Sequence, residues 1–339
     1  MNLISKGLRR IQYYLKNKAV VLSYHRVANN EIDPWQITVS EKNFQEQLEV
    51  LKKYEIISPA QLLERLRTKQ IKNNSVCITF DDGYQDNYDT AKPLLEKYNF
   101  RSTIFIPVHF IGEQKEFWWD ELQTLILGKR DLPDKLSIWI NAEFFQFDLS
   151  GEEVFNLTNY KKNESWLWYE DAKTKRAQLY LELWKQLRPL KYLEIEEVLK
   201  KLREWGAFKN YVDGRNFPMT KNQLQEIVDH RLFDVGIHTV THPALAYRSK
   251  EEQLSEIGDC KNQLEKLSGA SINTIAYPYG IFNDDTIQAA QELGLEIGFT
   301  TKGDSVQSTD HPLKLARFHV KNWNGIQFQK QLSTWFNGF

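Results

Sequence analysis

The chain has 339 residues and a formal net charge of −1, with 41% hydrophobic and 26% charged residues. This length is enough for one large α/β domain or two smaller ones. A net charge near zero gives no general attraction for nucleic acid, and no apolar stretch approaches the length that spans a bilayer. Cys77 and Cys260 are too few for a disulfide framework.

Residues 1–18 carry a basic amphipathic pattern. Its apolar positions are Leu3, Ile4, Leu8, Ile11 and Leu15. The pattern predicts a helix that either packs on the domain or lies on an anionic membrane surface. No apolar core of signal-peptide length precedes a small-residue cleavage site. We therefore expect a cytoplasmic protein, with peripheral association at the inner membrane surface as an option.

Short β-branched and aromatic runs alternate with helical patterns along the chain. The runs that predict strands are 19–25, 75–82, 102–107, 233–239, 274–280, 295–301 and 313–320. The clearest helical patterns are 41–54, 87–99, 251–268 and 284–294. This alternation predicts a parallel sheet with helices outside it. Seven strands with no glycine-rich phosphate loop after the first favour a closed or nearly closed barrel over an open doubly wound sheet.

Residues 117–217 break the alternation. They predict a hairpin at 136–149 and two charged helices at about 171–187 and 192–205. Because this α+β segment falls between the third and fourth expected strands, we interpret it as an insertion in a barrel formed by residues 19–320. Such an insertion would cover or flank the active site, or only decorate the barrel. Residues 321–339 would form a C-terminal tail.

Polar side chains stand at the carboxyl ends of several predicted strands, where βα barrels carry their catalytic groups. His25 ends the first strand, and Asp81 and Asp82 end the second. Neighbouring side chains on an extended chain point to opposite sides, so one carboxylate can bind a metal while the other acts as a base. An Asp-Asp-Gly sequence would also make an ordinary turn.

His238 and His242 follow the fourth strand and stand four residues apart. In a helical turn this spacing places both imidazoles on one face, which suits a single divalent ion. Two unrelated surface histidines would give the same pattern. With one carboxylate of the aspartate pair they would form a set of two nitrogens and one oxygen, typical of a catalytic zinc-like site with an open position.

Tyr277-Pro278-Tyr279-Gly280 ends the fifth strand. A backbone N–H on such a turn can help to hold a developing oxyanion, and we assign this role to Tyr279. Tyr277, Pro278 and Gly280 are candidates for substrate binding. Packed rings on an ordinary turn would also explain the sequence.

Three motifs of the chain, taken in order, resemble those of the polysaccharide deacetylase family, also called the NodB-homology carbohydrate esterases. The motifs are Thr79-Phe80-Asp81-Asp82-Gly83, His238-Thr239-Val240-Thr241-His242 and Tyr277-Pro278-Tyr279-Gly280. The resemblance covers roughly residues 19–320 apart from the insertion. It implies a deformed (β/α)7 barrel on which Asp82, His238 and His242 bind one divalent metal and Asp81 is the general base. Zinc is the expected metal, with nickel, cobalt or manganese as alternatives.

The opening strand, residues 22–27, is similar to that of the subgroup that deacetylates exopolysaccharides such as poly-N-acetylglucosamine, which implies His25 as the general acid. Two departures stand out. Many members have an arginine in the third motif that braces the catalytic aspartate. Here residues such as Ala276 and Tyr277 take its place, and Arg317 is a candidate for the brace that the sequence alone does not establish. Many also have a Leu-x-His motif that residues 315–319 match poorly, so His319 is the alternative acid.

The resemblance therefore predicts a hydrolase that removes N-acetyl groups from a polysaccharide, an oligosaccharide or a glycan precursor. One alternative is a hydrolase of another amide or of a lipid-linked sugar on the same barrel. Another is a barrel that binds carbohydrate without turnover. A binding module needs neither a metal triad nor a spare carboxylate, which argues against the second alternative.

Overall fold

A computed structural model of the chain describes residues 17–208 and 216–337. They divide into two compact units. The described residues of unit 1 are 17–29, 37–111 and 219–337, and those of unit 2 are 30–36, 112–208 and 216–218. Residues 1–16 of the predicted amphipathic segment lie outside the described part. Within that part, no helix combines the length and the apolar composition needed to cross a membrane.

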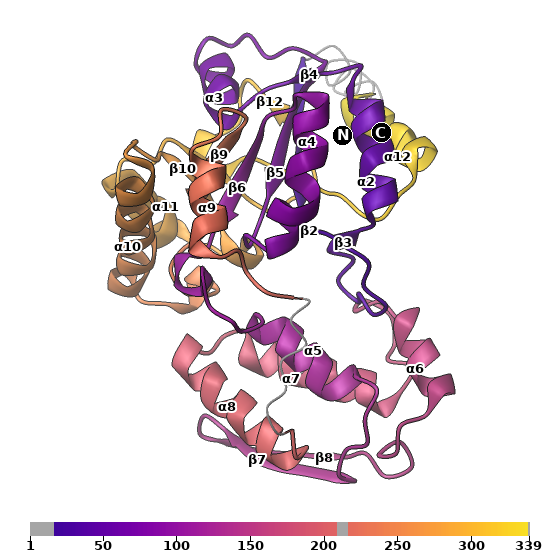
Figure 1. Ribbon diagram of the computed structural model, residues 1–339. Helices are drawn as coiled ribbons and strands as arrows, with labels where there is room; N and C mark the ends of the chain where they lie inside the picture. The colour runs from indigo at the N-terminus through magenta and orange to yellow at the C-terminus, as the bar shows by residue number, and fades with distance from the viewer. Residues whose placement is uncertain (1–16, 209–215, 338–339) are drawn as a thin grey trace, which may run out of the picture. The chain divides into compact units, whose positions relative to one another are not determined.

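Unit 1 is a mixed α/β fold built on a curled sheet (Figure 1), which confirms the predicted fold class at this level. Six strands follow one another as parallel neighbours. In spatial order they are β11 (Ile297–Phe299), β10 (Thr274–Ala276), β9 (Phe233–Ile237), β6 (Ser102–Ile106), β5 (Ser75–Phe80) and β1 (Lys18–Tyr24). Shorter strands extend the pairing: β4 (Glu55–Ile56) lies on β5, and β12 (Val306–Gln307) runs antiparallel to the start of β1.

The segment 315–319 contacts both ends of this strand order. Its strand β13 (Phe318–His319) pairs in parallel with β1 at Leu22 and Ser23. Just before it, Leu315 forms a parallel bridge with Phe299 of β11. The closing segment therefore brings the last part of the sheet beside the first.

Both faces of the sheet are buried, which explains why its strands read as continuous apolar runs. Successive side chains of β1 enter two different clusters. Val20 and Leu22 join the larger one, to which α10 and α12 contribute, whereas Ala19 and Val21 join a second one inside the curl. Helix α3 (Pro59–Arg67) supplies leucines to this inner cluster and lies at the end of the sheet near β4 (Figure 1).

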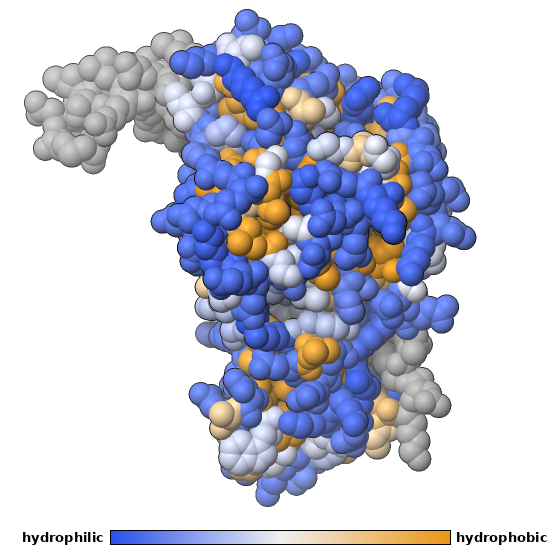
Figure 2. All heavy atoms as spheres, turned by 90° about the vertical axis from the view of Figure 1, so that its left-hand side faces the viewer, coloured by the Kyte–Doolittle hydropathy of each residue, from blue (hydrophilic) through white to orange (hydrophobic). Residues whose placement is uncertain are grey.

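Several of the remaining helices of unit 1 begin at a residue whose side chain caps the first turn. The remaining helices are α2 (Glu41–Leu51), η1 (Asn87–Ala91), α4 (Lys92–Tyr98), η2 (Val108–Phe110), α9 (Lys221–Val228), η3 (Leu245–Tyr247), α10 (Lys250–Ser268), η4 (Pro278–Gly280), α11 (Asp284–Glu292), η5 (Pro312–Lys314) and α12 (Gly325–Asn337). In α10, Ser249 and Glu252 form a capping box, and Gly269 ends the helix in the left-handed conformation. The surface on the α10 and α11 side is mostly hydrophilic, with apolar groups between polar ones (Figure 2).

Unit 2 contains the predicted hairpin and the two predicted helices, together with two further helices that the sequence did not indicate. Its elements are α5 (Trp118–Leu127), β7 (Lys135–Ile140), β8 (Glu143–Asp148), α6 (Leu157–Glu164), α7 (Lys175–Leu187) and α8 (Tyr192–Trp205). Residues 30–36 also belong to it, which the sequence did not indicate. Trp35 anchors this segment, because its ring lies 4.1 Å from that of Trp184 and its Nε1–H donates to Tyr180. In unit 1, β2 (Arg26–Val27) and β3 (Thr38–Val39) pair in parallel just before and after that segment.

The packing inside the curl predicts the effect of one added methyl group. A Cβ at Gly236 of β9 would collide with the ring of Phe105 on β6. We expect Gly236→Ala to lower the free energy of unfolding by about 1–3 kcal/mol, as overpacked cores do. At Gly303 the nearest atom would be a Phe318 carbon at 3.8 Å, so Gly303→Ala is the matched control. Urea denaturation of both variants measures the difference, and equal stabilities would contradict the packing described here.

Candidate active site

The two aspartates lie where β5 leaves the sheet. The N–H of Asp81 still donates to the carbonyl of Tyr24, at 2.9 Å, so Asp81 continues the pairing with β1. Asp82 and Gly83 then adopt the left-handed conformation, with φ of 73° and 66°. This sharp exit separates the two carboxylates, and both side chains are buried. As the sequence predicts, neighbouring carboxylates face different partners.

The segment between His238 and His242 is a loop rather than the predicted helical turn. Thr239 and His242 have φ of 68° and 57°, which an α-helix does not allow. The Thr239 hydroxyl replaces helical backbone bonds: it donates to the His238 carbonyl at 2.5 Å and accepts the His242 N–H at 3.1 Å. The two imidazoles still converge, with ring centroids 4.8 Å apart.

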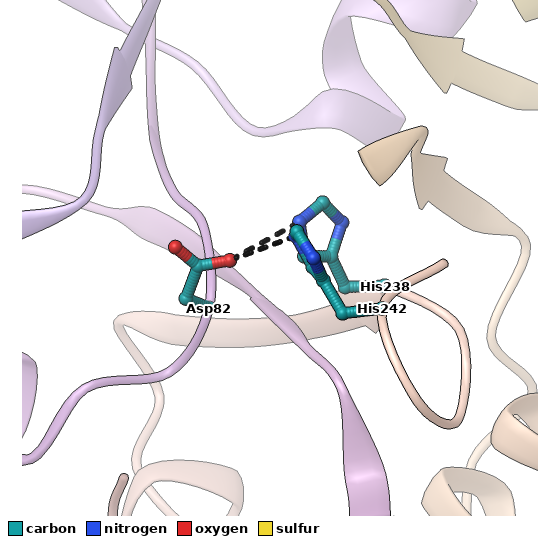
Figure 3. Close-up of side chains that lie close together, drawn as sticks. All are labelled: Asp82, His238 and His242. Carbon is teal, nitrogen blue, oxygen red and sulfur yellow. Dashed lines mark ion pairs between the residues drawn. The ribbon is translucent and has the colours of Figure 1, made fainter. Parts of the chain in front are cut away.

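Asp82 faces both imidazoles (Figure 3). Its Oδ1 lies 3.4 Å from Nε2 of His238 and 3.2 Å from Nε2 of His242. One ligand atom from each of the three buried residues lies within 4.8 Å of the others. Nδ1 of His238 pairs with the Ala276 carbonyl at 2.8 Å, a contact that orients Nε2 toward Asp82.

This set of donors fits a divalent metal ion. Two imidazole nitrogens and one carboxylate oxygen are the ligands of catalytic zinc-type sites that keep an open position. Among the described residues, no hydrogen bond satisfies the buried Oδ1 of Asp82, as expected of an atom shaped to hold an ion. The structure thus brings together the three residues predicted to bind metal.

Burial and neighbouring charges act in opposite directions on these groups. Burial disfavours the ionised carboxyls, but it is outweighed at both aspartates. The nearby imidazoles of His238 and His242 hold the pKa of Asp82 far below its usual range, and Arg317 is the main cause that lowers the pKa of Asp81. Burial also lowers the pKa of His242, which favours the neutral imidazole that binds metals.

Arg317 holds Asp81 through two parallel hydrogen bonds. Its Nη1 and Nη2 each lie 2.7 Å from a different carboxylate oxygen. The guanidinium itself is fixed, because Nε donates to the Thr300 carbonyl and Nη1 also reaches the Thr79 hydroxyl. Both partners are almost fully buried, with 1% and 5% of their side-chain surfaces exposed. The brace that the sequence could not establish is therefore present, and it comes from the closing segment.

The two histidines considered as acids lie beside this pair. Nε2 of His25 is 3.9 Å from Oδ2 of Asp81, and the His25 ring lies 5.5 Å from that of His319. A residue of η1 holds the backbone of His25, since the side-chain amide of Asn87 donates to the His25 carbonyl at 2.7 Å. Its side chain keeps 21% of its surface exposed, so it remains accessible to a substrate.

The Tyr-Pro-Tyr-Gly turn divides between the site and the core. The Tyr279 ring lies 4.6 Å from that of His242, and Tyr279 has a left-handed φ of 57°. The Tyr277 ring is fully buried, and its hydroxyl donates to the Leu313 carbonyl at 3.0 Å, so its side chain has a packing role here. Pro278 is also buried, and at Gly280 a Cβ would collide with Thr301.

Comparisons with known proteins bear on the family and the fold of the chain. The sequence profile of the family described as polysaccharide deacetylase matches residues 68–126 and 192–298. The poly-beta-1,6-N-acetyl-D-glucosamine N-deacetylase of Staphylococcus epidermidis is 21% identical over 94% of this chain and 87% of its own. The deacetylase PplD of Streptococcus pyogenes, solved with acetate, has a TM-score of 0.53 at 19% identity and covers 94% of this chain and 98% of its own.

IcaB from Ammonifex degensii has a similar structure as well. Its TM-score is 0.53 at 17% identity, with 95% of this chain and 98% of that one covered. At this identity the two solved structures bear on the fold alone, and that fold is the one described above. The fold and the profile match together define an enzyme of the deacetylase class. The chain belongs to the polysaccharide deacetylase family.

The buried ion pair predicts a specific pattern of stabilities. Arg317→Met should lower the free energy of unfolding by about 3–5 kcal/mol, because it leaves the Asp81 carboxylate buried without its partner. Adding Asp81→Asn should recover much of this loss, since the amide carries no charge. Chemical denaturation of the two single variants and the double variant measures the coupling. If the two single changes lowered the free energy of unfolding additively in the double variant, Arg317 and Asp81 would not be coupled as an ion pair.

Proposed function

We propose that this protein is a metal-dependent de-N-acetylase that removes acetyl groups from N-acetylated sugars of a polysaccharide or glycan precursor. The observation that carries the proposal is the buried Asp82, His238 and His242 group beside an Arg317-held carboxylate. The name of the S. epidermidis relative makes poly-β-1,6-N-acetylglucosamine the first substrate to test. The finer description of the fold as a deformed (β/α)7 barrel, with residues 117–217 inserted, belongs to the same proposal.

In this proposal Asp82, His238 and His242 hold one divalent ion, with zinc the first candidate. Such an ion supplies Lewis acidity at the acetyl carbonyl and lowers the pKa of water from about 15.7 toward about 7. The protein contributes the fixed ligands: the Ala276 carbonyl orients His238, and the hydroxyl of Thr239 fixes the backbone N–H of His242. Such fixed geometry leaves little reorganisation for the reaction to drive.

Asp81 would act as the base in this proposal. Its lowered pKa keeps the carboxylate ionised at neutral pH, and the Arg317 pair fixes the direction of its oxygens. His25, whose Nε2 is 3.9 Å from Asp81, would give a proton to the leaving amine, which departs poorly without one. His319 is the alternative donor, and the Tyr279 N–H is the proposed support for the oxyanion.

The metal assignment predicts a joint loss of metal and activity. His238→Ala removes one of two nitrogen ligands, so purified protein should hold little zinc and release little acetate from N-acetylated glycans. His230→Ala is the matched control, because His230 pairs with Glu96 instead of the aspartates. Elemental analysis and an acetate assay read out both variants. Full metal occupancy in His238→Ala would rule out this ligand set.

The division of labour between the adjacent aspartates gives a sharper test. Asp81→Asn should keep the metal and lose turnover by about 10²- to 10⁴-fold, because an amide cannot accept the proton. Asp82→Asn should weaken metal binding, and excess metal should restore part of its rate. Metal content and acetate release at several metal concentrations separate the two variants. Near-normal turnover of Asp81→Asn at saturating metal would show that another group is the base.

A further inference from the structure

The loop between His238 and His242 has an anionic partner that no sequence motif contains. Glu256, on α10, accepts three hydrogen bonds from this loop. Its Oε2 accepts the backbone N–H groups of Val240 and Thr241, both at 2.8 Å. Its Oε1 accepts the Thr241 hydroxyl at 2.6 Å. Both oxygens of one carboxylate are therefore used on two consecutive loop residues.

The carbonyl side of the same loop is held separately. The N–H of Val108 donates to the Thr239 carbonyl at 3.3 Å, and the N–H of His109 donates to the Val240 carbonyl at 3.1 Å. Residues of η2 thus bind the carbonyl groups of the loop, while Glu256 binds its N–H groups. The loop is clamped between two elements, and the ends of the clamped stretch are the two histidines.

Such a clamp has a physical purpose at this position. Thr239 and His242 both have left-handed φ, and a β-branched residue such as Thr239 adopts this conformation only when its surroundings impose it. The Thr239 hydroxyl closes the loop from within, but it leaves the Val240 and Thr241 N–H groups without helical acceptors. A carboxylate is the strongest acceptor a side chain can offer to paired N–H groups.

The helix that carries Glu256 is well anchored. The capping box at Ser249 and the Gly269 cap fix its two ends. Ile257, which follows Glu256, and Cys260, which lies one turn later, are both fully buried. The Cys260 thiol approaches the Ile106 carbonyl at 3.4 Å, and that carbonyl also accepts the His238 N–H at 3.2 Å. The helix therefore holds the Glu256 carboxylate in a fixed position.

We propose that Glu256 is a positioning residue of the metal site: its carboxylate holds the 238–242 loop so that His238 and His242 face Asp82 before the metal arrives. The proposal rests on the proposed metal site and adds a determinant of its affinity. Glu256 itself contacts no ligand side chain in the hydrogen bonds described, and it acts through the backbone of Val240 and Thr241.

The test compares zinc affinity, measured by titration against a competing chelator, in Glu256→Ala, Glu256→Gln and wild type. Loss of outer supports of a metal site typically weakens binding by about 10- to 100-fold, and we expect Glu256→Ala in that range. Glu256→Gln should weaken binding less, because its amide oxygen can still accept both N–H groups without the charge. The matched control is Glu252→Ala, which removes a carboxylate from the same helix that accepts the Ser249 N–H at the helix start.

A purely structural role would give a different result. Glu252→Ala and Glu256→Ala would then both lower the melting temperature of the metal-free protein, and both variants would keep the zinc dissociation constant of the wild type. That result would overturn the proposal. Wild-type protein that binds no zinc at this site would instead refute the proposed function. If Glu256→Ala does not fold, hydrogen exchange on metal-free wild type decides: we expect slow exchange at the Val240 and Thr241 amides, and rates typical of an open loop would overturn the clamp.

Discussion

The ion pair between Arg317 and Asp81 joins the closing segment to the end of β5, at the point where the chemistry is proposed. Asp81 leaves the sheet at the end of β5, and Arg317 arrives on the closing segment that bridges to β11 and pairs with β1. A buried charge of this kind is tolerated only when its partner is held in place. The closure of the sheet therefore sets the geometry of the carboxylate, and the packing inside the curl supports that closure.

The site gathers backbone strain as well as charge. Asp82, Thr239, His242 and Tyr279 all have left-handed φ, and each lies in one of the three motifs. Such conformations cost on the order of 1–3 kcal/mol each and persist where the surroundings over-determine them. Here the supports are identifiable: side-chain hydrogen bonds close the histidine loop, and two flanking elements bind its backbone. These hydrogen bonds offset the conformational cost of the left-handed residues in the histidine loop.

Much of this was accessible from the sequence because strand ends of a parallel sheet share one edge. The apolar runs before the Asp81-Asp82 pair and before His238 predicted that these strand ends would meet, and Asp82 does lie beside His238. The prediction of a helical turn after His238 was wrong, because the Thr239 hydroxyl takes the place of helical backbone bonds. The spacing of the two histidines does not reveal such a contact. Arg317 and Glu256 act on partners distant in sequence, so periodicity could not identify their targets. Residues 30–36 gave no pattern that assigned them to unit 2.

The strand order also bears on how the chain is made. Strand β6 lies beside β9, yet all of residues 107–232 separate them in the sequence. During synthesis at about 5–20 residues per second, β6 would wait on the order of ten seconds for its neighbour. Over that interval an apolar strand with an unpaired edge is exposed to other nascent chains, a recognised route to aggregation. Fast folding of the intervening residues, or a chaperone at that stage, would decide how much enzyme a cell recovers.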